Sequence, residues 1–257
     1  MEEQKDGQNP KVASLADRSE ERAGLRRGIY LLPNLITTGA LFSGFYAIIS
    51  AMSGALENAA VAIIVAGVLD ALDGRIARLT NTQSDFGVQY DSLSDLVAFG
   101  VAPAVLMFSW VLSDLGKFGW MAAFLYMACA ALRLARFNTK PDNTAFVGLA
   151  SPMAAGVLAT SVWVWTDNIA STVTLPLAIP MAALTVGAAA LMVSNFRYYS
   201  PKQIDMHRVP FIYMLGVVAL FALIVVNPPV VLLGLSVIYA GSGPVQAILR
   251  KRPRKSA

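Results

Sequence analysis

The sequence predicts an all-α membrane protein: a polytopic helical bundle of about eight transmembrane helices, with both termini in the cytoplasm. Of its 257 residues, 56% are hydrophobic and 14% are charged, whereas about a quarter of the residues in a soluble domain are charged. Apolar runs recur along the chain, and most approach the roughly 20 residues that a helix needs to cross a bilayer. These runs are continuously apolar, which is not the alternating pattern of a membrane β-barrel.

The first 27 residues are polar and mix acidic with basic side chains, so residues 1–27 are expected to form a cytoplasmic N-terminal arm. The apolar run that follows is too long for a signal peptide and lacks a clear small-residue cleavage site. Residues 28–249 are therefore the expected transmembrane domain, and residues 250–257 a basic cytoplasmic tail. The expected spans are Tyr30–Ser50, Ala59–Thr80, Gly87–Leu112, Phe118–Asn138, Leu149–Trp165, Val173–Ser194, Val209–Val226 and Val230–Leu249.

The basic residues determine the predicted orientation of these spans. Every Lys and Arg except Lys117 falls on one side of the membrane, and the positive-inside rule makes that side the cytoplasm. An even number of spans also requires both termini to share a side. Because the basic residues stand beside apolar runs, the net charge of +4 indicates topology and contact with anionic lipid rather than nucleic-acid binding.

The second and third spans carry acidic residues that a membrane helix normally lacks. Asp70 and Asp73 are three residues apart and Asp91 and Asp95 are four apart, so each pair lies on one helix face. The short connection makes the two helices antiparallel neighbours, and the four carboxylates converge. Because a carboxylate at mid-bilayer costs roughly 2.5–3.5 kcal/mol, such a cluster indicates function.

Hard divalent cations fit this cluster. Carboxylate oxygens without neighbouring Cys or His suit Mg²⁺ or Mn²⁺, and two such ions would neutralise four charges and clamp a diphosphate. The alternative is that the aspartates are helix-end charges paired with Arg75 and Arg78. Asp91 and Asp95 lie within about ten residues of the cytoplasmic end of their span, roughly 15 Å deep at most, so a polar nucleotide could reach the cluster from the cytosol while lipid tails stay in the bilayer.

The complete pattern resembles the signature of the CDP-alcohol phosphotransferase family. The resemblance implies that the four aspartates hold two divalent metal ions, that Asp95 is the general base, and that the small residues and the arginine of the signature pack around the CDP group. All eight fixed positions agree, as Asp70-x2-Asp73-Gly74-x2-Ala77-Arg78-x8-Gly87-x3-Asp91-x3-Asp95.

Other segments are similar to the membrane-integral bacterial phosphatidylserine synthases of that family. They are LLPNLITTGALFSGFYAI, DSLSDLVAFGVAPA, RLARFN and LMVSNFRYYSPK. The resemblance implies transfer of a phosphatidyl group from CDP-diacylglycerol to L-serine by direct metal-assisted attack, which gives phosphatidylserine and CMP. It also implies a homodimer in the bacterial inner membrane, with the active site facing the cytoplasm. One departure is Ala150, where proline is expected; it lies in a loop outside the metal site.

The resemblance also suggests substrate contacts outside the aspartate cluster. Asn34 and Thr37 are implied to contact CDP-diacylglycerol together with Asp73, although after Pro33 they could simply satisfy helix backbone groups. Arg133, Arg136 and Arg197 are candidates to hold the serine carboxylate, for which the planar guanidinium fork is suited. Each arginine could instead only anchor its helix at the cytoplasmic surface. Ala40 and Gly44, four residues apart, could allow close helix packing.

Other functions remain open from the residues alone. The same chemistry could use another acceptor, such as glycerol 3-phosphate or an inositol phosphate, which would favour a denser basic pocket. An acidic membrane core also suits a cation-coupled transporter, although no internal repeat supports one, and a structural scaffold is a further alternative. The single histidine, His207, is expected in a loop, so a Ser-His-Asp mechanism has no support.

Overall fold

The computed structural model describes residues 32–80, 82, 84–139, 146–169, 175–198 and 211–251, and the described chain is helical apart from short connections and one pair of two-residue strands. The predicted all-α class is therefore confirmed. The elements are a first helix Leu32–Met52, α2 (Leu56–Leu79), α3 (Asp85–Asp95), the π-helix η1 (Leu96–Val101), α4 (Ala102–Trp110), the 3₁₀ turn η2 (Leu112–Leu115), α5 (Lys117–Thr139), β1 (Phe146–Val147), α6 (Ser151–Val164), the π-turn η3 (Trp165–Ile169), α7 (Leu175–Val193), β2 (Arg197–Tyr198), α8 (Phe211–Val226) and α9 (Pro228–Lys251).

Each of the eight predicted spans corresponds to a helix or a continuous helical stretch. Within the described residues, five helices are long and apolar enough to cross a membrane. They are Leu32–Met52, Asp85–Trp110, Lys117–Thr139, Pro176–Val193 and Pro228–Ala247. The 24-residue helix α2 is also long enough, but the charged residues of the signature interrupt its second half. The helix α6 and the described helix α8 are shorter, at 14 and 16 residues.

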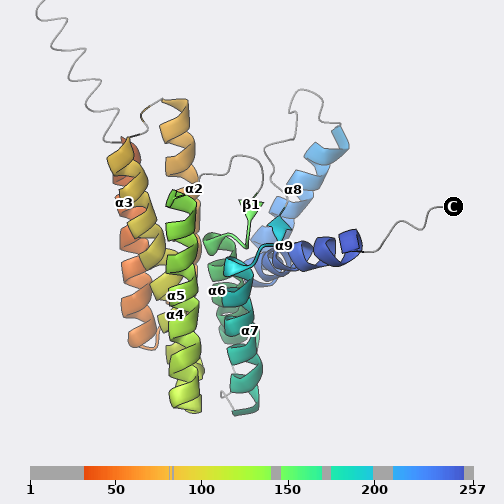
Figure 1. Cartoon of the computed structure of the whole chain (residues 1–257). Coiled ribbons are helices and arrows are strands. Elements are labelled where there is room, and N and C mark those ends of the chain that lie inside the picture. The colour runs from red at the N-terminus through yellow and green to blue at the C-terminus, as the bar shows by residue number, and fades with distance from the viewer. Residues whose placement is uncertain are drawn as a thin grey trace, which may run out of the picture.

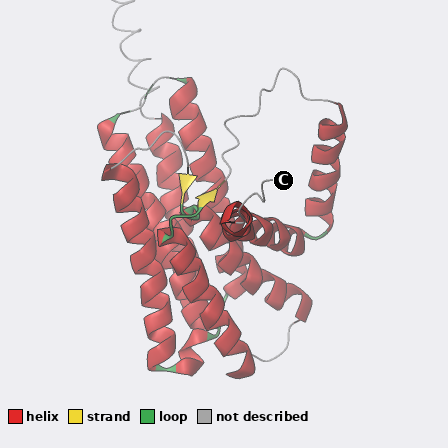
Figure 2. Ribbon diagram, turned by 45° about the vertical axis from the view of Figure 1, so that its right-hand side comes forward, coloured by secondary structure: helices red, strands yellow, loops and turns green. Residues whose placement is uncertain are grey.

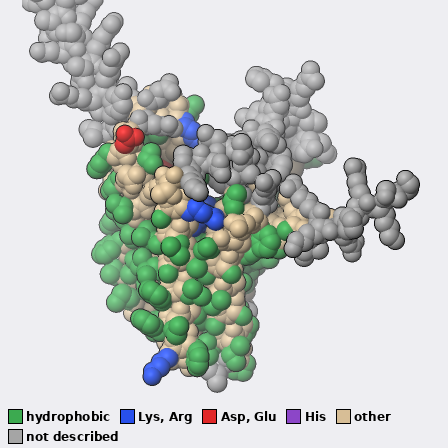
Figure 3. Space-filling view, viewed as in Figure 1, with side chains coloured by type: hydrophobic (Ala, Val, Ile, Leu, Met, Phe, Trp, Pro, Cys, Tyr) green, Lys and Arg blue, Asp and Glu red, His purple; other side chains and the backbone are tan. Residues whose placement is uncertain are grey.

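The helices from Leu32 to α7 run side by side as an antiparallel bundle, whereas α9 lies across the bundle direction and α8 lies outside it (Figure 1). Hydrophobic side chains cover most of the face of the bundle shown in Figure 3, and the few charged side chains visible there lie near the two ends and at one place part-way along it. Large apolar residues are correspondingly exposed; Phe42 is 68% exposed and Trp120 61%. An apolar exterior of this kind suits contact with lipid rather than water.

The core of the bundle consists largely of small residues, which let helices approach closely. Ala59, Ala66 and Ala98 are fully buried in it. At Gly44 a Cβ atom would lie 2.7 Å from the Cα of Ala98, so the first helix packs directly on the backbone of η1. The close packing predicted around Ala40 and Gly44 is present, and Ala40 is itself 2% exposed.

The π-helix η1 begins immediately after Asp95 and has a local cause. Pro103 has no N–H to donate to the carbonyl of Phe99, four residues earlier, and the N–H of Ala102 reaches back five residues to Val97. The buried hydroxyl of Tyr126 donates to the Phe99 carbonyl at 3.1 Å. One tyrosine of α5 therefore satisfies the backbone of the span that carries Asp91 and Asp95.

The two short strands join the segments that follow α5 and α7. They pair antiparallel, with Val147 opposite Arg197, and lie part-way along the longest helices (Figure 2). Gly148 follows with φ +82°, and a Cβ there would collide with the Met192 carbonyl. Ala150 has φ −61°, close to the angle that proline would fix, so the departure from the expected proline leaves the local backbone angle unchanged.

Candidate active site

Three of the four signature aspartates meet between α2 and the span that begins with α3. One carboxylate oxygen from each of Asp70, Asp91 and Asp95 lies within 4.8 Å of the other two. All three side chains are partly buried. The two helix faces predicted from the spacing thus bring their carboxylates together, and an oxygen-only donor set of this kind fits a hard divalent cation.

The fourth aspartate, Asp73, belongs to the same cluster but is held separately. It is 4% exposed, and its Oδ2 accepts a hydrogen bond of 2.6 Å from the Thr37 hydroxyl. Asp73 still interacts electrostatically with Asp70, Asp91 and Asp95. Thr37 therefore lies at the cluster, where its observed contact is with a signature carboxylate; its contact with CDP-diacylglycerol stays a prediction.

The first helix is tied to α3 by polar contacts on the same side as the cluster. The Thr38 hydroxyl hydrogen-bonds the Tyr90 hydroxyl at 2.9 Å, and the Ser94 hydroxyl donates to the Thr37 carbonyl at 3.2 Å. At Gly87 a Cβ would lie 3.4 Å from the side-chain oxygen of Asn34. Gly87 and Asn34, both predicted to contact CDP-diacylglycerol, therefore lie next to each other.

Within the described residues, neither arginine of the signature region forms a hydrogen bond with one of the four aspartates. Arg78 is exposed and its Nε donates to the Gly74 carbonyl of its own helix at 2.7 Å. Arg75 is also exposed and lies on a different face of α2, where it lines the groove described below. The alternative in which the aspartates are helix-end charges paired with Arg75 and Arg78 finds no support in the described contacts.

The three arginines predicted to hold the acceptor differ in their surroundings. Arg136 donates to the carbonyls of Val193 and Val147 at 3.3 and 3.0 Å, so it joins α5 to the ends of α7 and β1. Arg133 donates to the Ser151 hydroxyl at 3.1 Å and interacts electrostatically with Asp95. The backbone of Arg197 lies in β2, whereas its side chain lies outside the described residues. His207 lies outside them as well.

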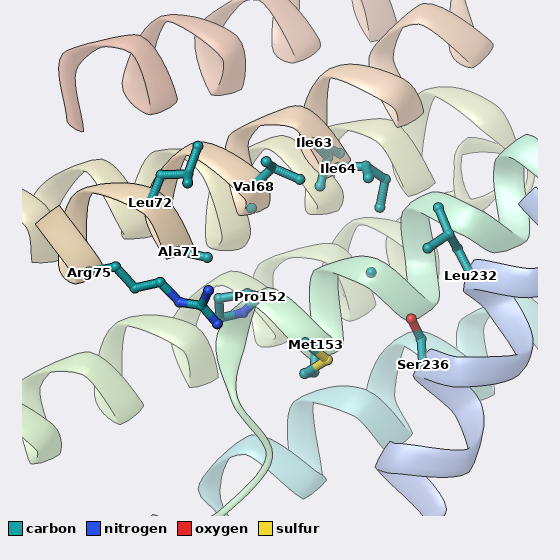
Figure 4. Close-up of a pocket in the computed structure, with 12 residues that line it drawn as sticks. Ile63, Ile64, Val68, Ala71, Leu72, Arg75, Pro152, Met153, Leu232 and Ser236 are labelled. Atoms are coloured by element: carbon teal, nitrogen blue, oxygen red, sulfur yellow. The ribbon is translucent and has the colours of Figure 1, made fainter. Parts of the chain in front are cut away.

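An apolar groove of about 410 Å³ runs between α2, α6 and α9. Figure 4 shows Arg75 at one end, extending toward Pro152, with Ile63, Ile64, Leu232 and Ser236 toward the other. Ile63 and Arg75 are twelve positions apart on α2, which corresponds to about 18 Å of helix. The sequence interpretation missed this groove, although Ile64, Val68, Ala71 and Arg75 share a helix face. Residue spacing on α2 could not predict that α9 forms the opposite wall of the groove.

Comparison with known proteins identifies the family. Residues 30–242 match the family model described as CDP-alcohol phosphatidyltransferase. A CDP-diacylglycerol–serine O-phosphatidyltransferase of Helicobacter pylori is 35% identical over 214 residues, which are 82% of this chain and 90% of the relative. Proteins of the same name match from Bacillus subtilis, at 34% over 168 residues (65% and 89%), and Methanocaldococcus jannaschii, at 42% over 111 residues (43% and 52%).

Proposed function

This chain belongs to the CDP-alcohol phosphatidyltransferase family, and we propose that it transfers the phosphatidyl group of CDP-diacylglycerol to L-serine. The products are phosphatidylserine and CMP. The observation that carries the proposal is the convergence of Asp70, Asp91 and Asp95 from two helices with the full family spacing. The acceptor is inferred from relatives named as CDP-diacylglycerol–serine O-phosphatidyltransferases over most of this chain.

We propose that Asp70, Asp73, Asp91 and Asp95 hold two Mg²⁺ or Mn²⁺ ions. The fit rests on the donor chemistry, since partly buried carboxylates cluster within 4.8 Å and the described arginine hydrogen bonds go elsewhere. When bound, the ions would neutralise the diphosphate and stabilise the charge that develops on the leaving CMP.

The small residues of the signature would admit the nucleotide. Gly74 and Ala77 lie on the cluster face of α2, and Gly87 lies next to the Asn34 side chain. We propose that Arg78, which is exposed beside Gly74, contacts the CMP phosphate from the cytosolic side. Thr37 acts through Asp73, because its hydroxyl fixes that carboxylate.

Asp95 is the proposed general base. It would accept the proton of the serine hydroxyl while the serine oxygen bonds to the phosphorus that carries diacylglycerol. The bond between that phosphorus and the bridging oxygen breaks, and CMP leaves with the electron pair. Asp95 has two carboxylate oxygens, so one can serve as a ligand while the other receives the proton.

The groove beside Arg75 supports a lipid donor. Its lining is apolar apart from Arg75 and Ser236, which suits an acyl chain with an anionic group at one end. Arg75 and the signature aspartates project from different faces of the same helix. We propose that one acyl chain of CDP-diacylglycerol lies along this groove, with Arg75 next to its phosphate end.

The wider setting is also part of the proposal. We place the chain in the bacterial inner membrane with eight spans, with both termini and the aspartate cluster toward the cytoplasm, because the basic residues favour that orientation. A homodimer is proposed on family likeness. Size measurement in detergent, corrected for bound detergent, would test the dimer.

Release of CMP from CDP-diacylglycerol by purified protein tests the function directly. We expect release only with both serine and Mg²⁺ or Mn²⁺, and loss of release in excess chelator. Asp95→Asn should lower turnover by about 10²-fold or more, the usual contribution of a general base, while CDP-diacylglycerol binding partly survives. Asp114→Asn is the matched control, because Asp114 is exposed in η2 outside the cluster.

Four outcomes would contradict parts of the proposal. Full activity without metal would remove the metal assignment, and near-normal turnover of Asp95→Asn would remove Asp95 as the base. Release driven by glycerol 3-phosphate or an inositol phosphate, but not by serine, would replace the acceptor while keeping the reaction class. Ion flux without CMP release would instead indicate the transporter.

A further inference from the structure

Arg133 is a partly buried arginine whose hydrogen-bonding capacity is only partly used by the protein. It lies near the end of α5, and its Nη1 donates to the Ser151 hydroxyl at 3.1 Å. Its Nε is buried and has no hydrogen-bond partner among the described residues. A buried charged donor left unpaired is unfavourable, so the arrangement indicates an acceptor from outside the described residues.

The surroundings of Arg133 place it beside the proposed reaction. Its electrostatic neighbours are Asp95, Arg136 and Tyr239. Asp95 is the proposed base for the acceptor hydroxyl. A ligand held by Arg133 would therefore have its far end near the base, as a small hydroxy acid requires.

Elements other than α5 hold this arginine. Ser151 is 0% exposed and is the first residue of α6. Tyr239 projects from α9 and stacks on Tyr198 with ring centroids 5.5 Å apart. The Tyr198 hydroxyl in turn donates to the α9 backbone at Ala240, at 3.1 Å. The guanidinium thus lies where α5, α6 and α9 meet.

We infer that Arg133 binds the carboxylate of the acceptor amino acid, and that Ser151 and Tyr239 are the positioning residues that orient its guanidinium. This inference rests on the proposed function and goes beyond it by selecting one arginine and two residues that set its geometry. The carboxylate distinguishes serine from other small primary alcohols, and a guanidinium fork binds a carboxylate through two parallel hydrogen bonds. Arg136 is not equivalent, because it already donates to two carbonyls.

A competing role for Arg133 is that it only counterbalances the charge of Asp95. In that case a change at Arg133 would affect every acceptor alike. Recognition of the carboxylate would instead affect L-serine but spare an acceptor in which the carboxylate is masked. L-Serine methyl ester keeps the hydroxyl and amine and removes this charge.

The test measures KM for L-serine and for its methyl ester, from CMP release, in the wild type and four variants. Where the ester turns over too slowly, its inhibition constant against serine replaces KM. We expect Arg133→Lys to raise the serine KM about tenfold or more, because lysine keeps the charge and loses the fork. The ester constant should stay within about twofold. Ser151→Ala and Tyr239→Phe should raise the serine KM several-fold in the same selective way.

Arg136→Lys is the matched control, and it should lower thermal stability without changing the ratio of the two constants. Equal changes of the serine and ester constants in Arg133→Lys would overturn the inference, and so would no change in either constant. Unchanged constants would favour the counter-ion role, because lysine keeps the charge. Should Arg133→Lys fail to fold, unchanged ratios in both Ser151→Ala and Tyr239→Phe would overturn it. If the wild-type protein releases no CMP with serine, the proposed function itself fails. If the wild type does respond to serine but the variants keep its ratio of serine to ester constants, only the role of Arg133 is contradicted.

Discussion

Thr37 shows how one hydroxyl supports the acidic cluster. Asp73 is 4% exposed, and a buried carboxylate needs hydrogen bonds or a cation to remain charged. The Thr37 hydroxyl lies 2.6 Å from Asp73 Oδ2 and 3.0 Å from the Pro33 carbonyl. Because a hydroxyl has one proton to donate, the carboxylate and the carbonyl compete for it. The short distance to Asp73 favours the charge-assisted bond.

Replacing Thr37 with Val removes this donor while keeping the side-chain shape. A hydrogen bond to a charged group contributes about 1.5–3 kcal/mol, so we expect Thr37→Val to raise the Mn²⁺ concentration for half-maximal CMP release by about tenfold or more. Thr37→Ser restores the hydroxyl and should recover most of the metal affinity. Equal metal dependence in Thr37→Val and the wild type would show that Asp73 does not rely on this hydroxyl.

At the scale of helices, the same combination of proline and tyrosine occurs twice. Pro103 leaves the Phe99 carbonyl without its usual donor, and the Tyr126 hydroxyl of α5 supplies one at 3.1 Å. Pro244 within α9 similarly frees the Ala240 carbonyl, to which the Tyr198 hydroxyl donates at 3.1 Å. Backbone groups away from water must be paired within the protein, so each tyrosine makes a helix-interior proline tolerable and fixes a neighbouring element against that helix.

Tyr126→Phe should therefore destabilise the fold by leaving the Phe99 carbonyl without this donor. We expect a loss of about 1–3 kcal/mol, measured as thermal unfolding in detergent. Pro103→Ala restores an N–H four residues after Phe99, so the same tyrosine change should cost less in that background. Tyr46→Phe is the matched control, because Tyr46 is 47% exposed. Equal effects of Tyr126→Phe with and without Pro103 would contradict the explanation.

Two glycines of the first helix allow a direct comparison of helix packing. At Gly44 a Cβ would lie 2.7 Å from the Ala98 backbone, whereas at Gly39 it would make an ordinary contact of 3.6 Å with the Leu69 side chain. Alanine in a helix is otherwise favoured over glycine by about 0.5–1 kcal/mol. We expect Gly39→Ala to be neutral or stabilising and Gly44→Ala to destabilise by about 1–3 kcal/mol, as overpacking does.

Thermal unfolding of the two glycine variants decides this prediction. Because Ala98 lies three residues after Asp95, Gly44→Ala should also lower turnover at temperatures where the protein is still folded. Equal stability of the two alanine variants would mean that the first helix and η1 separate without cost.

At the scale of the whole molecule, long apolar runs predicted the elements, because continuous hydrophobicity is a strong signal for membrane helices. All eight runs contain helix in the described chain. The path of α9 across the bundle (Figure 1) could not be predicted, since it depends on contacts with α6 and β2 rather than on composition. The π-helix was also not predicted, although Pro103 indicated that the backbone hydrogen bonds of this helix would be irregular.

The sequence predicted those parts of the aspartate cluster that depend on residues of a single helix face, or on two helices joined by a short connection. Asp70 with Asp73, and Asp91 with Asp95, follow from helix periodicity. The separate contact of Asp73 with Thr37 depends on how the first helix rotates. The distinction between Arg133 and Arg136 depends on the Ser151 hydroxyl and on the carbonyls of Val147 and Val193, which lie outside α5. Spacing within one helix contains no information about such partners.

The side of the membrane on which the C-terminal tail lies depends on how many of the last two helices cross. The basic residues predict both termini in the cytoplasm, whereas α9 lies across the other helices in Figure 1. Labelling with an impermeant maleimide can decide on which side the tail lies. The reagent is applied to intact cells and to inside-out vesicles, each containing a protein variant with one introduced cysteine. The native Cys129 is first replaced by Ala, and cysteines are introduced at Ser14, Lys117 and Ser256.

We expect cysteines at positions 14 and 256 to react only from the cytoplasmic face and the cysteine at position 117 only from the opposite face. The reason is that Lys117 is the one basic residue that the predicted spans leave outside. Labelling of positions 14 and 256 from opposite faces would mean an odd number of crossings, with one of α8 and α9 lying along the membrane. Labelling of position 117 from the cytoplasm would instead reverse the bundle and move the aspartate cluster away from the nucleotide pool that its proposed reaction requires.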